Sequence, residues 1–206
     1  MPIHALFATQ IYTASLRARG WQSLNRQLLL ECRQLRRDDA AGRRWSEAHY
    51  PGGYTSYGSA CRMHTVSPTF ALLQRQLDRR VAIFARALEF DLRRGRKLVM
   101  TDCWVNIMPR RVVHTLHLHP LSTLSGVYYV HTPRGSTALK FEDPRLERFM
   151  AAPPRRANCS PANRPWSPVA AEAGRVVLFE SWLRHGVPPN EARGERISVS
   201  FNYSWF

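Results

Sequence analysis

The sequence predicts one mainly β domain with flanking helices, built on an antiparallel barrel or a double-sheet jelly roll. From Leu98 onward the chain is a series of short β-rich runs separated by proline, glycine and asparagine, with no helical stretch between them. Turns in place of crossover helices are typical of barrels and of two packed sheets. Two amphipathic stretches come before Leu98 and predict helices that cover the sheet. We therefore expect a single domain over residues 1–206, with a strand and buttressing helices in 1–97 and the jelly-roll core in 98–206.

The elements follow from their periodicity. Residues 6–13 read as a short strand, and residues 15–37 carry leucines among arginines at rough helical spacing. A glycine-rich loop (YPGGYTSY, 50–57) follows. Ser67 and Pro68 predict an N-cap and a first-turn proline for a second helix, which the apolar spacing extends to about Arg94. The expected core strands lie within 98–108, 124–132, 137–143, 174–181 and 196–206.

A loop at 151–168 interrupts the strands. It holds five prolines together with Arg155, Arg156, Arg164 and Trp166. Long loops at the end of a barrel often carry function. We expect this loop to lie beside the barrel mouth and to contact the substrate, with the YPGGYTSY loop as a second determinant.

Composition narrows the class of protein. The 206 residues are 44% hydrophobic and contain no apolar run long enough to span a membrane. The start of the chain has no signal-peptide pattern, so the expected location is cytoplasmic. The four cysteines are scattered and form no C-x-x-C pair, which predicts free thiols. Oligomeric state is left open.

The net charge of +15, from 30 basic and 15 acidic residues, suits an anionic partner. The basic residues are spread over several segments and no nucleic-acid motif accompanies them, which argues against nucleic acid. A small molecule or a peptide, either of them acidic, fits this charge at least as well.

Histidines give the first indication of chemistry. His117 and His119 stand at alternate positions of an apparent strand start, so both side chains can point into a barrel mouth. Neutral imidazole is a good ligand for Fe(II). His185, at the end of the run GRVVLFESWLRH, offers a third imidazole. Two surface histidines on a polar strand face are the alternative for the pair.

The last strand adds an anion site. Its polar residues (Arg196, Ser198, Ser200 and Asn202) alternate with apolar ones, so one face is polar and can line the barrel interior. A buried arginine needs an anion, because an unpaired buried charge is very costly. The planar fork of Arg196 matches a carboxylate, and Ser198 can add a hydroxyl. A structural arginine–glutamate pair on an exposed strand is the alternative.

Seven segments occur along the chain in this order: LFATQIY, YPGGYTSY, WVNIM, HLHPLSTLSGVYYV, KFEDPR, GRVVLFESWLRHGVPPN and ERISVSFNY. Taken together, they resemble the 2-oxoglutarate- and Fe(II)-dependent oxygenases, and most of all a bacterial group of that superfamily. The resemblance covers most of the chain and implies a double-stranded β-helix core. It implies that His117 and His185 are metal ligands, that Arg196 and Ser198 hold the C5 carboxylate of 2-oxoglutarate, and that Tyr129 can hydrogen-bond the same carboxylate.

One position departs from the pattern of the superfamily. Its usual first motif is His-x-Asp/Glu, whereas His119 stands here in the acidic position. Either the site uses three histidines, which we favour because His119 has the required spacing, or a carboxylate arrives from elsewhere. Asp143 is the first candidate for such a carboxylate, ahead of Glu142 and Asp102.

The resemblance implies hydroxylation of an unidentified substrate with dioxygen and 2-oxoglutarate, and no catalytic residues beyond the metal site. Two other functions remain open from the sequence. One is a cupin-like three-histidine enzyme that does not use 2-oxoglutarate, and the other is a non-catalytic jelly roll whose basic surface grips an anionic partner.

Overall fold

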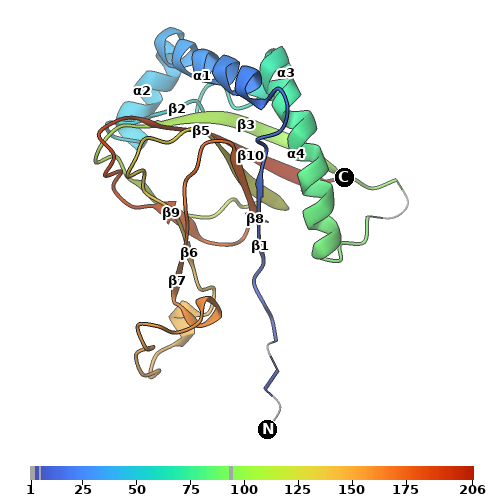
Figure 1. Ribbon diagram of the computed structural model, residues 1–206, viewed down its shortest axis with the longest axis vertical. Helices are drawn as coiled ribbons and strands as arrows, with labels where there is room; N and C mark the ends of the chain where they lie inside the picture. The colour runs from blue at the N-terminus through green and yellow to red at the C-terminus, as the bar shows by residue number, and fades with distance from the viewer. Residues whose placement is uncertain (1–2, 5, 93–94) are drawn as a thin grey trace.

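The computed structural model describes residues 3–4, 6–92 and 95–206. Two antiparallel sheets form the core, and the helices lie over the outer face of the larger one (Figure 1). In sheet order, the six strands of the larger sheet are β1 (Ile11–Ser15), β8 (Arg175–Glu180), β5 (Leu124–His131), β10 (Arg196–Trp205), β3 (Leu98–Met108) and β2 (Tyr54–Thr55). The smaller sheet consists of β4 (His114–His117), β9 (His185–Val187), β6 (Leu139–Glu142) and β7 (Trp166–Val169). This confirms the predicted mainly β fold with flanking helices.

The helices belong almost entirely to the first 97 residues, as predicted. They are α1 (Trp21–Asp38), α2 (Ala40–His49), α3 (Met63–Val66) and α4 (Pro68–Ala87), and two short 3-10 turns follow later at Leu146–Arg148 and Pro161–Asn163. Ser67 caps α4 by accepting a hydrogen bond from the backbone N–H of Phe70, and Pro68 occupies the first turn, as the sequence predicts. The helix ends at Ala87, short of the predicted Arg94, which lies outside the described residues.

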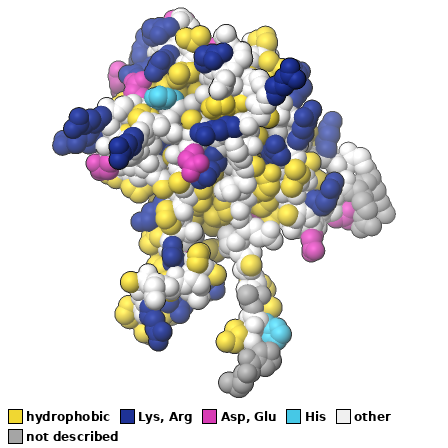
Figure 2. All heavy atoms as spheres, in the orientation of Figure 1, with side chains coloured by type: hydrophobic (Ala, Val, Ile, Leu, Met, Phe, Trp, Pro, Cys, Tyr) yellow, Lys and Arg dark blue, Asp and Glu magenta, His cyan; other side chains and the backbone are white. Residues whose placement is uncertain are grey.

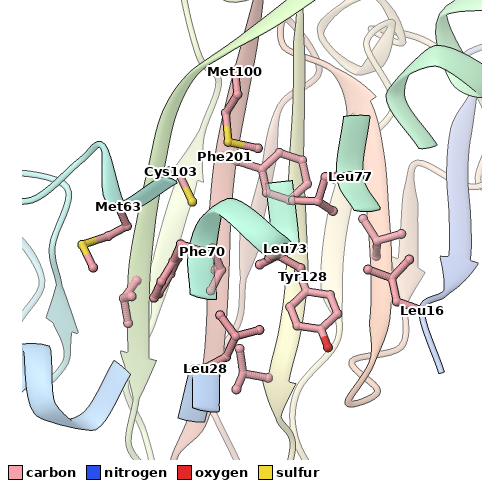
Figure 3. Packing of buried hydrophobic residues seen from close by; sticks show 14 of the residues in the cluster. Leu16, Leu28, Met63, Phe70, Leu73, Leu77, Met100, Cys103, Tyr128 and Phe201 are labelled. Atoms are coloured by element: carbon pink, nitrogen blue, oxygen red, sulfur yellow. The ribbon is translucent and has the colours of Figure 1, made fainter. Parts of the chain in front are cut away.

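One core fills the space between the helices and the large sheet. The buried stripe of α4 contains Phe70, Leu73 and Leu77, and these side chains point toward Tyr128 and Phe201 of the sheet (Figure 3). All five side chains are fully buried. A second core, between the two sheets, contains residues of β5, β6 and β8. The two cores hold the large sheet from both faces, which makes it a rigid support for side chains that point inward.

The first strand lies later in the chain than predicted. The expected strand 6–13 is found at Ile11–Ser15, because β1 pairs with β8 only from Ile11 opposite Phe179 to Ser15 opposite Arg175. Phe7, in the predicted part, has a φ of 58° and is almost fully exposed. The first helix likewise begins at Trp21, after Gly20 with a φ of 83°, and not at residue 15.

Two predictions about the class of protein can be compared with the structure. All four cysteines, each within the described ranges, are free thiols, as predicted. No helix of the described chain is long and apolar enough to cross a membrane. On the face drawn in Figure 2, lysine and arginine side chains are scattered over several elements and do not form one patch.

Candidate active site

Three histidines meet where the two sheets approach each other. His117 ends β4 and faces His185 of β9 in the strand register, and His119 follows two residues later. One ring nitrogen from each of His117, His119 and His185 lies within 4.8 Å of the others. His119 lies beyond the end of β4, where a hydrogen bond of 2.9 Å from its backbone N–H to the carbonyl of Ser181 holds the chain. The three histidines that the sequence predicted as ligands therefore lie together. His117 and His185 are on strands, whereas His119 is not.

The hydrogen bonds of two of the rings, His117 and His185, fix which nitrogen carries the proton. Nδ1 of His117 lies 2.7 Å from the carbonyl of Thr115, and Nδ1 of His185 lies 2.8 Å from the carbonyl of Leu183. A carbonyl oxygen only accepts, so Nδ1 must donate in both rings. Each Nε2 then keeps a free lone pair, which is the form that binds a metal.

Burial also favours the neutral form of these rings. It lowers the pKa of His185 to about 2 and that of His119 to about 4, with repulsion from neighbouring imidazoles as a further cause. The hydrogen bond to Asn202 and the charge of Asp102 act in the opposite direction on the pKa of His119. Burial lowers the pKa of His117 as well. At neutral pH the trio therefore presents uncharged imidazoles.

None of the predicted alternative carboxylates belongs to this cluster. Asp143 is bound by Arg145 through two contacts, of 2.8 and 3.0 Å, and also accepts the backbone N–H of Arg145, so it closes a turn. Glu142 forms an ion pair of 2.8 Å with Arg184. Asp102 lies on β3 and hydrogen-bonds Thr101. The geometry favours the three-histidine reading over these carboxylates.

Arg196 occupies the inner part of the same site. The alternation of β10 places Arg196, Ser198 and Ser200 in one inner cavity with the three histidines, while Ile197 and Val199 pack into the helix-side core, as predicted. Arg196 is 3% exposed, and no carboxylate of the described chain lies within ion-pair distance of it. The predicted alternative, a structural pair with glutamate on an exposed strand, is therefore wrong.

Several buried polar atoms around Arg196 lack a hydrogen-bond partner. They are Nε of Arg196 itself, the hydroxyls of Tyr129 and Tyr50, and Oδ1 of Asn106. The guanidinium carbon of Arg196 lies 4.9 Å from the ring centroid of Tyr129. Burial raises the pKa of Tyr129, and the nearby Arg196 charge lowers it in part. Nε of Arg196 and the two tyrosine hydroxyls can donate to an anion with several oxygen acceptors, whereas Oδ1 of Asn106 only accepts.

A larger cavity of about 920 Å³ opens outward from His117 and His119. One wall is aromatic: the ring of Trp45 lies 6.2 Å from that of Tyr57, Tyr57 lies 5.1 Å from Trp104, and Trp104 lies 5.8 Å from His119. The lining also contains Leu118 and the fully exposed Leu121. This cavity is the route by which a second molecule can reach the histidines.

The cavity corrects one sequence prediction and supports another. No residue of 151–168 lines either cavity, and the segment projects from the body beyond β6 and β7 (Figure 1), so its predicted position beside the mouth is wrong. The YPGGYTSY loop contributes Tyr50, Pro51, Thr55 and Tyr57 to the lining, as expected of a substrate determinant.

Sequence reasoning missed several residues of the site. Ser125 and Ser181 are fully buried and hydrogen-bonded next to His119, and Tyr50 lies close enough to Arg196 for its charge to affect the pKa of the tyrosine. Nothing in the local pattern marks Ser181, and the sequence predicted Tyr50 only as part of a substrate loop, not as a neighbour of Arg196. Trp104 and Asn106 line the inner cavity, whereas Tyr128 faces the helices and Trp182 is half-exposed.

Comparison with known proteins agrees with this geometry. Residues 102–202 match a family described as "Putative 2OG-Fe(II) oxygenase". None of the curated proteins matches the chain significantly.

Several solved structures share the fold at low identity. A Pseudomonas putida prolyl-4-hydroxylase is similar with a TM-score of 0.56 at 17% identity, covering 97% of this chain and 94% of that chain. The epimerase SnoN, solved with Fe3+, alpha ketoglutarate and nogalamycin RO, has a TM-score of 0.61 at 15% identity, covering 95% and 79%. HygX from Streptomyces hygroscopicus, solved with nickel, 2-oxoglutarate and hygromycin B, has a TM-score of 0.59 at 16% identity, covering 95% and 83%. These similarities show the fold, the predicted double-stranded β-helix.

Proposed function

Since the chain belongs to the 2-oxoglutarate- and Fe(II)-dependent oxygenases, we propose that it is a dioxygenase that hydroxylates a substrate bound in the outer cavity. The observation that supports this most is a single inner cavity lined by three neutral imidazoles and by a buried, unpaired arginine. One set of residues suits a metal and the other suits a dicarboxylate.

The donor set fits Fe(II). His117, His119 and His185 would hold the ion through Nε2, because carbonyl oxygens occupy the Nδ1 side of two of the rings. Three protein ligands leave coordination positions for a cosubstrate and dioxygen. A set of three neutral histidines carries one negative charge fewer than the usual set of two histidines and a carboxylate.

The pocket around Arg196 fits 2-oxoglutarate. Arg196 would bind the C5 carboxylate with its planar fork, while Ser198 and Tyr129 supply hydroxyls. We add Tyr50 to this set, since its hydroxyl is buried without a partner and the charge of Arg196 reaches it. The anion would satisfy donors that are otherwise buried at a cost in free energy.

When bound, Fe(II) with 2-oxoglutarate and dioxygen supplies oxidation of a C–H bond, and 2-oxoglutarate leaves as succinate and carbon dioxide. The chain orients the participants. His117 and His119 line both cavities, so a substrate on the aromatic wall of Tyr57 and Trp104 approaches the ligand side of the imidazoles. Val127 and Phe179 add apolar surface to the lining of the inner cavity.

The same observations weigh against the two other functions. A cupin-like enzyme without 2-oxoglutarate leaves the buried Arg196 unexplained. A basic binding module leaves the three converging neutral imidazoles unexplained, and on the face in Figure 2 the basic residues form no continuous surface. A small molecule or an exposed peptide side chain is the class of substrate that the cavity can admit.

Anaerobic titration with Fe(II), with and without 2-oxoglutarate, tests this proposal. We expect one Fe(II) per chain and a weak visible charge-transfer band that needs both components. Admission of dioxygen should then release succinate slowly in the absence of substrate. Iron binding without the band and without succinate would support the cupin-like enzyme. Absence of stoichiometric iron would overturn both metal-dependent functions.

A further inference from the structure

A row of polar residues crosses three adjacent strands behind His119. Asn202 of β10 faces Ser125 of β5 on one side and Asp102 of β3 on the other in the strand register. Residues opposite each other in antiparallel strands carry their side chains on the same face of the sheet. Ser125 and Asn202 are buried, at 0% and 6% exposed, whereas Asp102 is partly exposed and lines the outer cavity.

Hydrogen bonds connect this row to His119. Nδ1 of His119 lies 2.8 Å from Oδ1 of Asn202 and 2.7 Å from Oγ of Ser125. The Ser125 hydroxyl donates to the same Oδ1 at 2.8 Å. Because Oδ1 only accepts, Nδ1 of His119 donates its proton to it and Nε2 is left free. The amide of Asn202 then points its Nδ2 toward Oδ2 of Asp102, at 3.4 Å.

A β-bulge produces this alignment. The register of β10 against β3 shifts between Asn202 opposite Asp102 and Tyr203 opposite Met100, so Thr101 is the extra residue. Met100 consequently packs into the helix-side core, while Asp102 lines the outer cavity. Bulges often re-aim side chains next to active sites. The hydroxyl of Thr101 donates to Oδ2 of Asp102 at 2.7 Å and orients the carboxylate.

The charge of Asp102 is not neutralised by a neighbouring cation. Within the described chain no lysine or arginine lies within ion-pair distance of it. Asp143 and Glu142, by contrast, are each paired with an arginine. Asp102 is therefore the carboxylate whose charge remains available near the histidines.

We propose that Asn202 and Asp102 are positioning residues that supply, through a hydrogen-bond relay, the negative charge that a carboxylate ligand would have given at position 119. The relay runs from Nδ1–H of His119 to Oδ1 of Asn202, and from Nδ2–H of Asn202 to Asp102. It makes the His119 ring a stronger electron donor and fixes its tautomer, as partners of metal-bound histidines do in general. This inference rests on the proposed function, since it assigns a role toward the metal.

Two variants separate this relay from a purely structural role, because they shift the reduction potential of bound iron in opposite directions. Asp102→Asn removes the charge and keeps the size of the side chain, so Fe(II) is favoured over Fe(III) and the potential rises. The double variant Asp102→Asn/Asn202→Asp keeps the net charge and moves it one hydrogen bond closer to His119, so the potential falls below that of the wild type. We expect each shift to be about tenfold in the Fe(III)/Fe(II) ratio, which is about 59 mV for one electron.

The measurement is an anaerobic spectroelectrochemical titration of the iron-loaded protein, with Asp143→Asn as a control that removes one carboxylate outside the site. The control should leave the potential unchanged. A second readout uses metal-free protein: 15N NMR should show His119 protonated at Nδ1 in the wild type and in Asp102→Asn, and should show loss of that single tautomer in Ser125→Ala/Asn202→Leu.

Shifts of the same sign in Asp102→Asn and in the double variant, or no shift in either, would overturn the relay while leaving the proposed function intact. A wild-type His119 protonated at Nε2 in the metal-free protein would overturn it as well. Failure of the wild type to hold iron would instead overturn the proposed function.

Discussion

The guanidinium of Arg196, which lines the inner cavity, lies over the ring of Tyr129, 4.9 Å from its centroid, and no carboxylate of the described chain lies within ion-pair distance of it. Both are nearly or fully buried. Nε of Arg196 and the hydroxyl of Tyr129 each lack a hydrogen-bond acceptor or donor. A native protein rarely buries such a group without a use for it, so the pocket is best explained as a receptor for an anion.

Replacement of Arg196 by alanine should weaken 2-oxoglutarate binding and spare iron. Loss of a charge-assisted bidentate contact should cost about 2–5 kcal/mol of binding free energy. Lysine should restore only part of it, because it lacks the planar fork. Anaerobic titration with 2-oxoglutarate measures the affinity, and Arg184→Ala, which breaks an exposed ion pair with Glu142, is the control. Equal affinity in Arg196→Ala and Arg184→Ala would contradict the assignment.

His119→Ala should abolish stoichiometric iron, whereas Asp143→Ala should keep it. His119 belongs to the trio within 4.8 Å, while Asp143 is engaged by Arg145. Loss of a ligand should reduce metal affinity by more than the roughly 10–100-fold that loss of an outer partner causes. Metal analysis after gel filtration gives the stoichiometry. The opposite pattern, with iron lost only in Asp143→Ala, would show that a carboxylate completes the site.

The sequence predicted those parts of the site that depend on local periodicity. The alternation of β10 required Arg196 and Ser198 to share a face, and the spacing of His117 and His119 kept both rings on the same side. Features that depend on a partner strand could not be predicted. The start of β1 is set by β8, and the bulge at Thr101 is visible only in the register of two strands.

The direction of the 151–168 loop was missed for a similar reason. Loop composition carries no information about direction, which is set here by β6 and β7, and the segment between them extends away from the body of the molecule (Figure 1). The wall that the loop was expected to supply comes from α2 and from residues that follow it, among them Trp45 and Tyr57.

Replacement of residues 153–164 by a short glycine–serine linker should therefore leave iron and 2-oxoglutarate affinity unchanged. The segment lines neither cavity, and its residues lie outside both buried clusters. The melting temperature should also change little. Affinity titrations and thermal denaturation of the two proteins measure this. A marked loss of 2-oxoglutarate affinity would show that the loop reaches the site.

Asp39 should stabilise the cavity wall in a pH-dependent manner. Burial acts to raise its pKa, but hydrogen bonds from Ser59, the backbone of Gly42 and Tyr54 outweigh burial and lower the pKa below 3.8. The unfolded chain therefore takes up the proton first as the pH falls. The stabilisation is fully present above pH 3.8 and is lost as the pH falls through the pKa of Asp39 in the folded protein.

Asp39→Ala should thus lower the free energy of unfolding by about 1–2 kcal/mol at pH 7, since Asp39 also caps α2. The deficit should shrink at pH 3. Urea denaturation at both pH values measures it, with the exposed neighbour Asp38→Ala as control. A deficit that is equal at the two pH values would mean that the charge of Asp39 is not what stabilises the wall.

Gly186→Ala should disrupt the metal centre without touching a ligand. Gly186 follows His185 on β9, and a Cβ at this position would lie 2.9 Å from the backbone oxygen of His114 and 3.2 Å from the backbone nitrogen of Leu116. Backbone atoms cannot rotate away as a side chain can, so β4 and β9 must separate. His117 on β4 then moves away from His185 on β9, and the two donors no longer fit one ion.

Overpacking of this kind typically costs about 1–3 kcal/mol of stability. We expect a folded protein by circular dichroism whose affinity for Ni(II), a redox-inert probe, falls at least about tenfold by calorimetry. Wild-type Ni(II) affinity in Gly186→Ala would show that the contact between β4 and β9 does not set the spacing of the ligands.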